Sequence, residues 1–414
     1  MENTQGLAHR VAFAGLIYFA LTLPFQFGFL PVAGAFAFFL FSWIGEKRYK
    51  TMGRELKSGP WFFLLIFIAW ELISLLWADP WTKAGQAVNR LLPILLFIWL
   101  LMGKKFSSKE WRIVWYVFSF SMLASMIAAL AMGVPRYLET GDTSQFYYMK
   151  LSRFLERQPH YIALYAASAL AFLCLEFFRL IKTHKSKAYS VLIPAALLLL
   201  YVFLLSARAQ VFALIGVTVM AILYLFYRKK QVLKGVLWSA LAVAVLALGL
   251  MGSPKARERF EESVKQGDLF VDETGGGDPR VITWKLALKT IWQSPIIGHG
   301  IGAANLKLIE NAKETQGAEI VVERRLNFHN QYLQILGNTG IIGLALFLVW
   351  GFVLLRFGFQ TEHWLFVLTL ALMAISFLTE SMLLRMAGAR FLVFLLASML
   401  CLIPDSKPAS PDEK

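Results

Sequence analysis

Two kinds of sequence meet in the stretch NFHNQYLQILGNTGIIGLALFLVWGFVLL (residues 327–355), and together they decide the fold. From residue 331 onward the stretch is almost continuously apolar, and it is long enough for a helix to cross a bilayer. The one long polar stretch of the chain, from Met251 to Gln331, leads into it. We therefore expect a membrane protein whose chemistry takes place at the membrane surface, where these two stretches join.

The composition of the whole chain supports this expectation. The 414 residues are 58% hydrophobic and 16% charged, which is more apolar surface than a water-soluble core of this size hides. We expect an all-α, polytopic membrane protein of about 12 transmembrane helices. The apolar runs that predict them are 11–28, 29–45, 61–78, 87–103, 112–132, 159–179, 189–206, 210–227, 235–251, 331–355, 363–381 and 388–404.

Loop charges predict the orientation, because short loops rich in Lys and Arg stay in the cytoplasm. Such loops, at 46–57, 103–112, 179–187 and 228–234, all follow even-numbered spans, so both termini are expected in the cytoplasm. The predicted divisions are a membrane domain with nine spans (1–251), a large periplasmic loop with helices (252–330), the last three spans (331–404) and a cytoplasmic tail (405–414).

The net charge of +15 does not indicate a nucleic-acid partner. Most lysines lie in the loops that topology places in the cytoplasm, whereas the segments expected outside carry mainly arginine. Arginine grips phosphate or carboxylate through two parallel hydrogen bonds. The outer face is therefore expected to bind an anionic ligand.

A lone arginine interrupts apolar sequence in FLLSARAQVFAL (residues 203–214). Burying an uncompensated cation at membrane depth is costly, so such residues usually serve a function. Arg208 is therefore a candidate ligand-binding residue, and Gln210 beside it offers an amide that can orient a ligand. The alternative is that Arg208 anchors the topology by extending to the lipid headgroups.

The polar stretch is expected to contain a helix that begins at Arg280. A flexible link, ETGGG (residues 273–277), precedes Asp278, which is suited to cap that helix. Arg280 is either a ligand-binding residue or a solvated surface charge. Apolar residues at helical spacing predict that one face of this helix lies on the membrane or on the bundle: Val281, Trp284, Leu288 and Ile291.

After this helix comes SPIIGHGIG (residues 294–302), in which glycines alternate. Glycine can turn backbone amides toward an anion or let a ligand come close. Gly298 and Gly300 are therefore possible substrate contacts. The other interpretation is a plain turn between two helices.

His329 is the candidate base. Asn327 is suited to cap the helix of the next span, which would place His329 in its first turn, beside Asn330. A helix N-terminus disfavours the imidazolium cation, and a neutral imidazole can accept a proton. Asn330 is a possible substrate contact. Alternatively, His329 is an interfacial histidine that only hydrogen-bonds a loop carbonyl.

Three motifs together resemble the bacterial O-antigen ligases and their relatives, the O-antigen polymerases and the protein O-oligosaccharyltransferases. They are SARAQ (residues 206–210), the Arg280 helix with SPIIGHGIG, and FHNQYLQILGNTGIIGLALF (residues 328–347). The resemblance implies a GT-C-like glycosyltransferase of the Gram-negative inner membrane, which uses an undecaprenyl-diphosphate-linked glycan at the periplasmic face. His329 resembles the catalytic histidine of that family. Four arginines resemble its diphosphate-binding residues, the last two more loosely: Arg208, Arg280, Arg153 and Arg157.

The residue chemistry agrees with this resemblance. A lipid diphosphate is a good leaving group, so the site needs cations to hold its developing charge more than it needs an acid. The acceptor hydroxyl must lose a proton as it attacks, and His329 can accept it. Direct attack inverts the anomeric centre. The first outer loop around 24–28 has no acidic residues, so we expect neither a metal nor another cofactor.

Among the relatives, the single large loop favours an O-antigen ligase, which transfers the finished polymer to lipid A-core oligosaccharide. The expected partners are therefore the lipid-linked donor, this acceptor and membrane lipids. Polymerase and protein-modifying activities stay open, as does a transporter or flippase of anionic polyprenyl-linked lipids. Glu71 and Glu176 are the only acids well inside apolar runs, too few to outline a translocation path.

Overall fold

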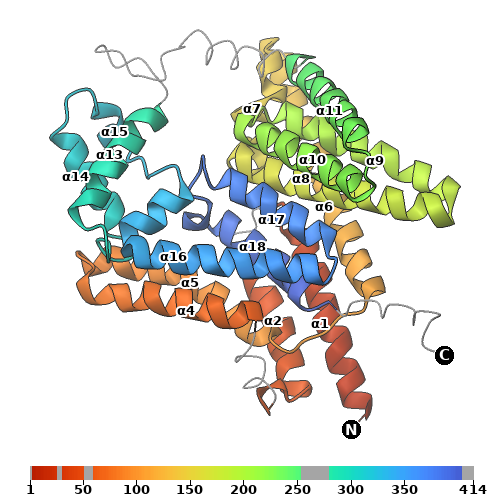
Figure 1. The fold of residues 1–414 in the computed structure, drawn as a ribbon, viewed down its shortest axis with the longest axis horizontal. Coiled ribbons are helices and arrows are strands. Elements are labelled where there is room, and N and C mark those ends of the chain that lie inside the picture. Colours follow the sequence, from red (N-terminus) through yellow and green to blue (C-terminus); the bar gives the residue numbers. More distant parts are fainter. Residues whose placement is uncertain (1, 26–29, 51–58, 253–278, 403–414) are drawn as a thin grey trace.

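A computed structural model of the chain describes residues 2–25, 30–50, 59–252 and 279–402, and every regular element in these ranges is a helix (Figure 1). In chain order the elements are α1 (Glu2–Thr22), α2 (Leu30–Gly45), η1 (Arg48–Lys50), α4 (Gly59–Ile73), η2 (Ser74–Trp77), α5 (Trp81–Leu101), α6 (Ser108–Thr140), η3 (Thr143–Phe146), α7 (Tyr148–Ser152), η4 (Arg153–Leu155), α8 (Pro159–Thr183), α9 (Lys185–Leu204), α10 (Arg208–Arg228), α11 (Val232–Gly252), α13 (Pro279–Gln293), α14 (Ala304–Lys313), α15 (Glu319–Glu323), α16 (Gln331–Gln360), α17 (Trp364–Ser376), η5 (Met382–Leu384) and α18 (Met386–Leu400).

Each predicted span corresponds to an apolar helix. Within the described residues, eight helical stretches are long and apolar enough to cross a membrane. They lie in α4 with η2, α5, α6, α8, α9, α10, α11 and α16. The other four predicted spans are shorter apolar helices, α1, α2, α17 and α18. The chain is an all-α, multi-pass membrane protein, as its sequence predicted.

The eleventh predicted span, 363–381, is too long. Helix α17 ends at Ser376, and an irregular stretch with η5 connects it to α18. The carbonyl of Phe377 accepts a hydrogen bond from the backbone N–H of Gln331 (2.7 Å), so the chain after α17 pairs with the start of α16. Glu380 therefore lies in the irregular stretch between α17 and η5 and not in a helix.

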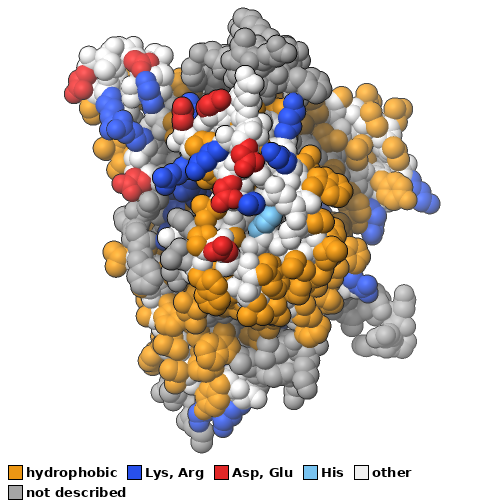
Figure 2. Space-filling view, turned by 90° about the vertical axis from the view of Figure 1, so that its left-hand side faces the viewer, with side chains coloured by type: hydrophobic (Ala, Val, Ile, Leu, Met, Phe, Trp, Pro, Cys, Tyr) orange, Lys and Arg blue, Asp and Glu red, His pale blue; other side chains and the backbone are white. Residues whose placement is uncertain are grey.

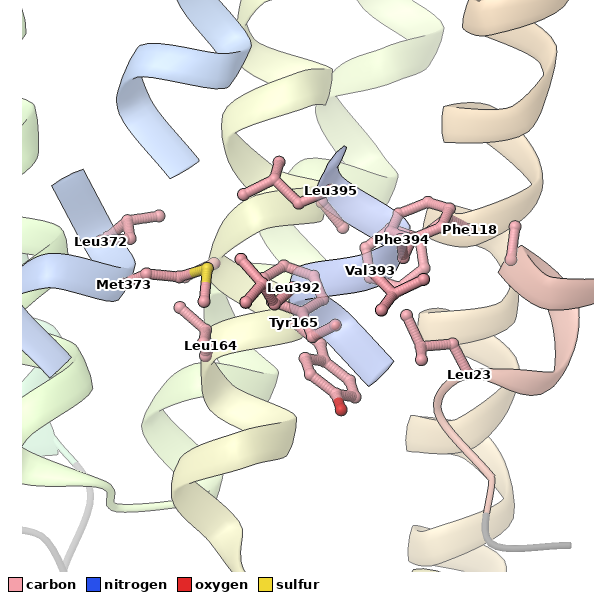
Figure 3. Packing of buried hydrophobic residues seen from close by; sticks show 14 of the residues in the cluster. Leu23, Phe118, Leu164, Tyr165, Leu372, Met373, Leu392, Val393, Phe394 and Leu395 are labelled. Atoms are coloured by element: carbon pink, nitrogen blue, oxygen red, sulfur yellow. The ribbon is translucent and has the colours of Figure 1, made fainter. Parts of the chain in front are cut away.

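Helices α8 and α18 form the centre of the bundle. Every residue of α18 from Phe391 to Leu400 is buried, and a helix that is apolar all round is expected to be surrounded by others. Figure 3 shows Phe394 of α18 beside Phe118 of α6, where the ring centroids lie 5.0 Å apart. Tyr165 of α8 stacks on Phe391 at 4.7 Å. These aromatic contacts pack α18 against both α6 and α8.

The loops sort into two groups that lie at opposite ends of the helices. Three segments predicted to be cytoplasmic meet through Lys104, which bonds to Glu46 and to His9 Nδ1, the latter at 2.9 Å. At the other end, segments predicted to lie outside meet, and Arg157 Nη2 donates to the carbonyl of Phe25 at 2.9 Å. This sorting agrees with the predicted topology, while the side on which each end lies stays a prediction.

The described part of the large loop, 279–330, has a small core of its own. Helices α13, α14 and α15 group together at the upper left of Figure 1, beside the ends of α4, α5 and α16. Phe328 packs against Gly337 at the start of α16, where a Cβ would come within 2.7 Å of the ring. The buried residues of this core are Ile282, Leu286, Ala287, Ile291, Ala304, Leu308, Ala312, Ala318, Val321 and Phe328.

Most of the predicted apolar face of the Arg280 helix does not pack on the bundle, and its contact with the membrane stays a prediction. Leu288 is 48% exposed, and Val281 and Trp284 are only partly buried. The face that packs on α14 and α16 is the neighbouring one, which includes two threonines whose hydroxyls donate to carbonyls one turn earlier. The link 273–277 and Asp278 lie outside the described residues.

Candidate active site

The sequence predicted His329 in the first turn of helix α16. In the structure, His329 lies just before this helix. The cap of α16 is Asn330, whose side chain accepts from the backbone N–H groups of Tyr332 (2.9 Å) and Leu333 (3.0 Å). The predicted cap, Asn327, instead accepts from the N–H of His329 at 2.8 Å. His329 has a left-handed backbone with φ 45°, which costs a non-glycine residue about 1 kcal/mol. That strain is typical of residues held for function.

The imidazole of His329 faces a buried carboxylate. Its Nδ1 lies 3.2 Å from Oε2 of Glu380, whose side chain is 9% exposed. Burial alone would raise the pKa of Glu380. The hydrogen bond from His329 and the charges of His160 and Arg280 outweigh that effect and hold this pKa below its ordinary value.

The ionised state of Glu380 fixes the tautomer of His329. A carboxylate only accepts hydrogen bonds, so Nδ1 of His329 must donate. The lone pair of the neutral imidazole then lies on Nε2. His329 is therefore arranged to accept a proton through Nε2.

The stretch that carries Glu380 is fastened directly to the start of α16. The N–H of Asn330 donates to the hydroxyl of Ser381 (3.2 Å), and its Nδ2 donates to the carbonyl of Leu378 (3.0 Å). The side chain of Gln331 accepts from the N–H of Leu383 at 2.8 Å. These bonds lie on both sides of the pair of His329 and Glu380, so its geometry is fixed before any ligand arrives.

Further basic groups surround Glu380. Nε2 of His160, at the start of α8, lies 3.9 Å from Oε2 of Glu380, within ion-pair range but too far for a hydrogen bond. Arg280 and Arg385 are close enough to act electrostatically on His160. Figure 2, viewed from the side on which α13–α15 lie, shows basic, acidic and histidine side chains gathered on this face, above a band of hydrophobic side chains.

A second pair of cations lies nearby in the bundle. Arg157 is 6% exposed, its Nε has no hydrogen-bond partner among the described residues, and its guanidinium carbon lies 6.0 Å from the Tyr165 ring centroid. The charges of Arg157 and Arg390 act on each other and on Tyr165. Two cations held this close favour an anion beside them.

The remaining predicted arginines differ in their positions. Arg208 is the first residue of α10 and is half-buried. Gln210 accepts from the hydroxyl of Ser376 at 2.7 Å, which fastens the start of α10 to the end of α17, just before the Glu380 stretch. Arg153 is exposed on η4.

Gly298 and Gly300 of SPIIGHGIG pack against a kink in α16. Gly340 interrupts that helix with φ 67° and ψ −168°. The N–H of Gly300 donates to the carbonyl of Asn338 at 2.8 Å, and that of Ile341 donates to the carbonyl of Pro295 at 2.9 Å. A Cβ on Gly298 would meet the Asn338 backbone at 2.4 Å. These contacts account for both glycines structurally, so their contact with substrate stays a prediction.

Four residues of the cluster were not assigned from the sequence. His160 lies in the same stretch as Arg157, and Arg385 and Arg390 lie in a segment predicted to be outside, but nothing in their spacing links them to His329. Glu380 carried the best signal, because it is the one acid in the short outer stretch 379–390, which also contains two arginines. Within the described residues, no group of three His, Cys, Asp or Glu side chains has a geometry that could hold a metal ion.

The two acids noted inside apolar runs are both partnered. Glu71 Oε1 accepts from the hydroxyl of Thr339 at 3.3 Å, beside the kink of α16. Glu176 pairs with Arg179 at 2.6 Å and accepts from the Tyr116 hydroxyl at 2.9 Å. They lie on different helices and form no continuous polar path.

Residues 193–348 match the family model described as O-antigen ligase. This region of the chain is therefore similar in sequence to the O-antigen ligase domain. The domain contains Arg208, Arg280 and His329, whereas Glu380 lies beyond it, so the site joins the matched region to the helices that follow. No curated protein matches the chain. Members of this family are glycosyltransferase-like enzymes whose partners in general are lipid-linked glycans and lipid A-core.

Proposed function

We propose that this protein is an O-antigen ligase of the Gram-negative inner membrane. It transfers O-antigen polysaccharide from undecaprenyl diphosphate to lipid A-core oligosaccharide at the periplasmic face. The observation that carries the proposal is the paired His329 and Glu380, surrounded by cations, next to a match to the O-antigen ligase family. In this assignment the loop 252–330 and the N-terminal ends of α8 and α18 face the periplasm, and both termini of the chain face the cytoplasm.

The donor diphosphate binds to the arginines. Guanidinium groups match the geometry of phosphate and stay charged near an apolar boundary. Arg280, which acts on Glu380 and His160, and Arg208, at the start of α10, are the first candidates. Arg157 is supported by its burial and its unpartnered Nε. Alanine at Arg208 or Arg280 should lower transfer by about two to three orders of magnitude, by analogy with other lost transition-state donors.

The transfer is a direct displacement at the anomeric carbon. The acceptor hydroxyl oxygen forms the new glycosidic bond while the bond from that carbon to the diphosphate oxygen breaks. The bonding electron pair leaves with the diphosphate, where the arginines stabilise it. The hydroxyl proton moves to Nε2 of His329. Attack from the opposite side inverts the anomeric configuration.

Glu380 is a positioning residue in this account. It holds the Nδ1–H of His329, so that Nε2 faces the acceptor, and its charge stabilises the imidazolium that forms. This division of labour resembles that of a base and its orienting acid in other transferases and hydrolases.

The reaction proceeds without a metal ion in this proposal. Guanidinium groups take the place that a cation bound by carboxylates has in metal-dependent transferases. Purified protein should therefore keep its full rate in excess EDTA. A loss of activity that magnesium or manganese restores would contradict this.

A cellular experiment separates the ligase from its relatives. A deletion strain complemented with His329→Ala should show free lipid A-core on a lipopolysaccharide gel, with full-length polymer accumulating on its lipid carrier. Core capped with a single repeat unit would indicate a polymerase. Unchanged lipopolysaccharide, together with a defect in protein glycosylation, would indicate a protein O-oligosaccharyltransferase. Polymer that is missing from the periplasmic face altogether would indicate a flippase.

A further inference from the structure

A cavity of about 670 Å³ lies beside the cluster of His329 and Glu380. Residues of α4, α5, α14, α15, α16, η5 and α18 line it. Gln331 and Leu383 line it, and the hydrogen bond between these two residues is one of those that fasten the Glu380 stretch to α16. The volume is within the usual range for pockets that bind small organic ligands, about 300 to 1,000 Å³.

Hydrogen-bonding groups in the wall of this cavity lack partners. Gln334 is 1% exposed; its Nε2 donates to Asn338 at 3.3 Å, but its Oε1 has no partner among the described residues. Oδ1 of Asn305, on α14, also has no hydrogen-bond partner among the described residues. Glu71, 5% exposed, lines the cavity too, and its Oε1 accepts a long hydrogen bond from the Thr339 hydroxyl at 3.3 Å. A buried acceptor left unsatisfied costs about 1 to 3 kcal/mol, so a ligand that donates to these oxygens would bind favourably.

The rest of the lining describes an amphipathic ligand. Toward the membrane domain the cavity is apolar, with Phe67 of α4, Trp350 of α16 and Leu392 of α18. Toward the large loop it has two exposed cations, Lys313 at the end of α14 and Arg325 after α15. The wall therefore changes from apolar, through amides and a carboxylate, to basic.

We propose that this cavity binds the hydroxyl-rich sugar part of a glycolipid, next to the reacting groups. Hydroxyl groups can donate to Gln334, Asn305 and Glu71 and accept from the amide N–H groups, which an anion cannot do. The aromatic and aliphatic lining takes the adjoining apolar part of the lipid, and the two cations suit acidic substituents on its sugars. The inference rests on the proposed function in one respect, because the ligand is taken to be either the lipid-linked donor or the lipid A-core acceptor.

Binding measurements on the purified full-length protein test this inference. The probes are lipopolysaccharide that lacks O-antigen and, separately, an undecaprenyl-diphosphate-linked glycan. The variants Gln334→Leu and Asn305→Leu each remove unpartnered acceptors from the wall at similar volume. Each should weaken the binding of one of the two probes by about tenfold, the loss expected for one or two hydrogen bonds.

The matched control is Gln360→Leu, the same substitution on an exposed position of the same helix. It should leave both affinities unchanged. Gln334→Leu should also keep or raise the melting temperature of the ligand-free protein, because it removes a buried unsatisfied oxygen. This readout shows that the variant is folded.

The outcome shows whether the sugar in the cavity belongs to the donor or to the acceptor. Weakened binding of the O-antigen-free lipopolysaccharide alone assigns the cavity to the acceptor, and weakened binding of the lipid diphosphate alone assigns it to the donor. Unchanged binding of both probes by folded Gln334→Leu and Asn305→Leu proteins would overturn the inference. Normal transfer by His329→Ala would instead refute the proposed mechanism, and it would leave these binding results standing.

Discussion

His329 Nδ1 and Glu380 Oε2 lie 3.2 Å apart although 51 residues separate them in the chain. One residue precedes α16 and the other precedes α18, and hydrogen bonds on either side fasten the two segments together. The contact gives His329 a defined tautomer and a defined direction. In a glycosyltransferase of the proposed kind, this contact supplies what a proton acceptor needs.

Replacing Glu380 should slow turnover while donor binding is kept. We expect Glu380→Gln to lower the rate by about tenfold to a hundredfold, because the neutral amide can hold Nδ1–H but no longer stabilises the imidazolium. The acid limb of the pH–rate profile should move to lower pH in this variant, since a negative charge beside the base has been removed. Steady-state rates across pH measure both effects.

The low pKa of Glu380 also makes the stability of the folded protein depend on pH. Because its pKa in the folded protein is below the ordinary value, its contribution is present above that ordinary value and is lost as pH falls through the folded-state pKa. The melting temperatures of wild type and Glu380→Gln should therefore converge in acid. Glu323→Gln, at an exposed position of α15, is the control and should change neither the rate nor the melting temperature. Equal pH–rate profiles for wild type and Glu380→Gln would remove Glu380 from the mechanism.

Arg153 and Arg157 form a natural pair for testing the diphosphate site. Both came from the same sequence motif, but Arg157 is buried beside Tyr165 and Arg390, whereas Arg153 is exposed. Arg157→Ala should lower transfer by about a hundredfold, Arg157→Lys should recover part of the loss, and Arg153→Ala should cost less than about tenfold. Equal losses at both positions, in proteins with normal melting curves, would mean that burial does not distinguish them.

The sequence predicted the helices well and the site only in part. Each apolar run became a helix, because length and hydrophobicity are local properties that the membrane requires. The start of α16 was misjudged because Asn327 and Asn330 are equally suited to cap it. The choice depends on the carbonyl of Phe377, which a sequence pattern does not reveal. Glu380 and His160 were not predicted as site residues for the same reason, since only tertiary packing brings them to His329.

The kink of α16 should be sensitive to a single methyl group. A Cβ on Gly340 would lie 2.0 Å from the carbonyl oxygen of Ile296, and the φ of 67° is unfavourable for alanine. Gly340→Ala should therefore destabilise the protein by about 3 kcal/mol. Gly351→Ala, on the same helix with nothing within 4 Å of its Cβ, should be neutral or slightly stabilising. Thermal melts in detergent compare the two, and equal melting temperatures would show that the kink can relax.

The orientation is open to cysteine labelling in whole cells. After Cys174 and Cys401 are replaced by serine, single cysteines in place of Asp142 and Glu314 should react with a membrane-impermeant maleimide. Cysteines in place of Lys185 and Lys229 should react only after the inner membrane is permeabilised, because their loops carry the positive charge that stays inside. Protection of the Glu314 position in intact cells would invert the topology and move the site to the cytoplasm.

The most direct test of the account measures donor binding and turnover together in His329→Ala. The arginines and not the histidine hold the diphosphate, so the variant should bind the undecaprenyl-diphosphate-linked glycan with an affinity within about twofold of wild type. Its single-turnover transfer rate should fall by about two to four orders of magnitude. A transfer rate near that of wild type, in a protein that binds donor normally, would show that His329 is not the base and would contradict the central claim.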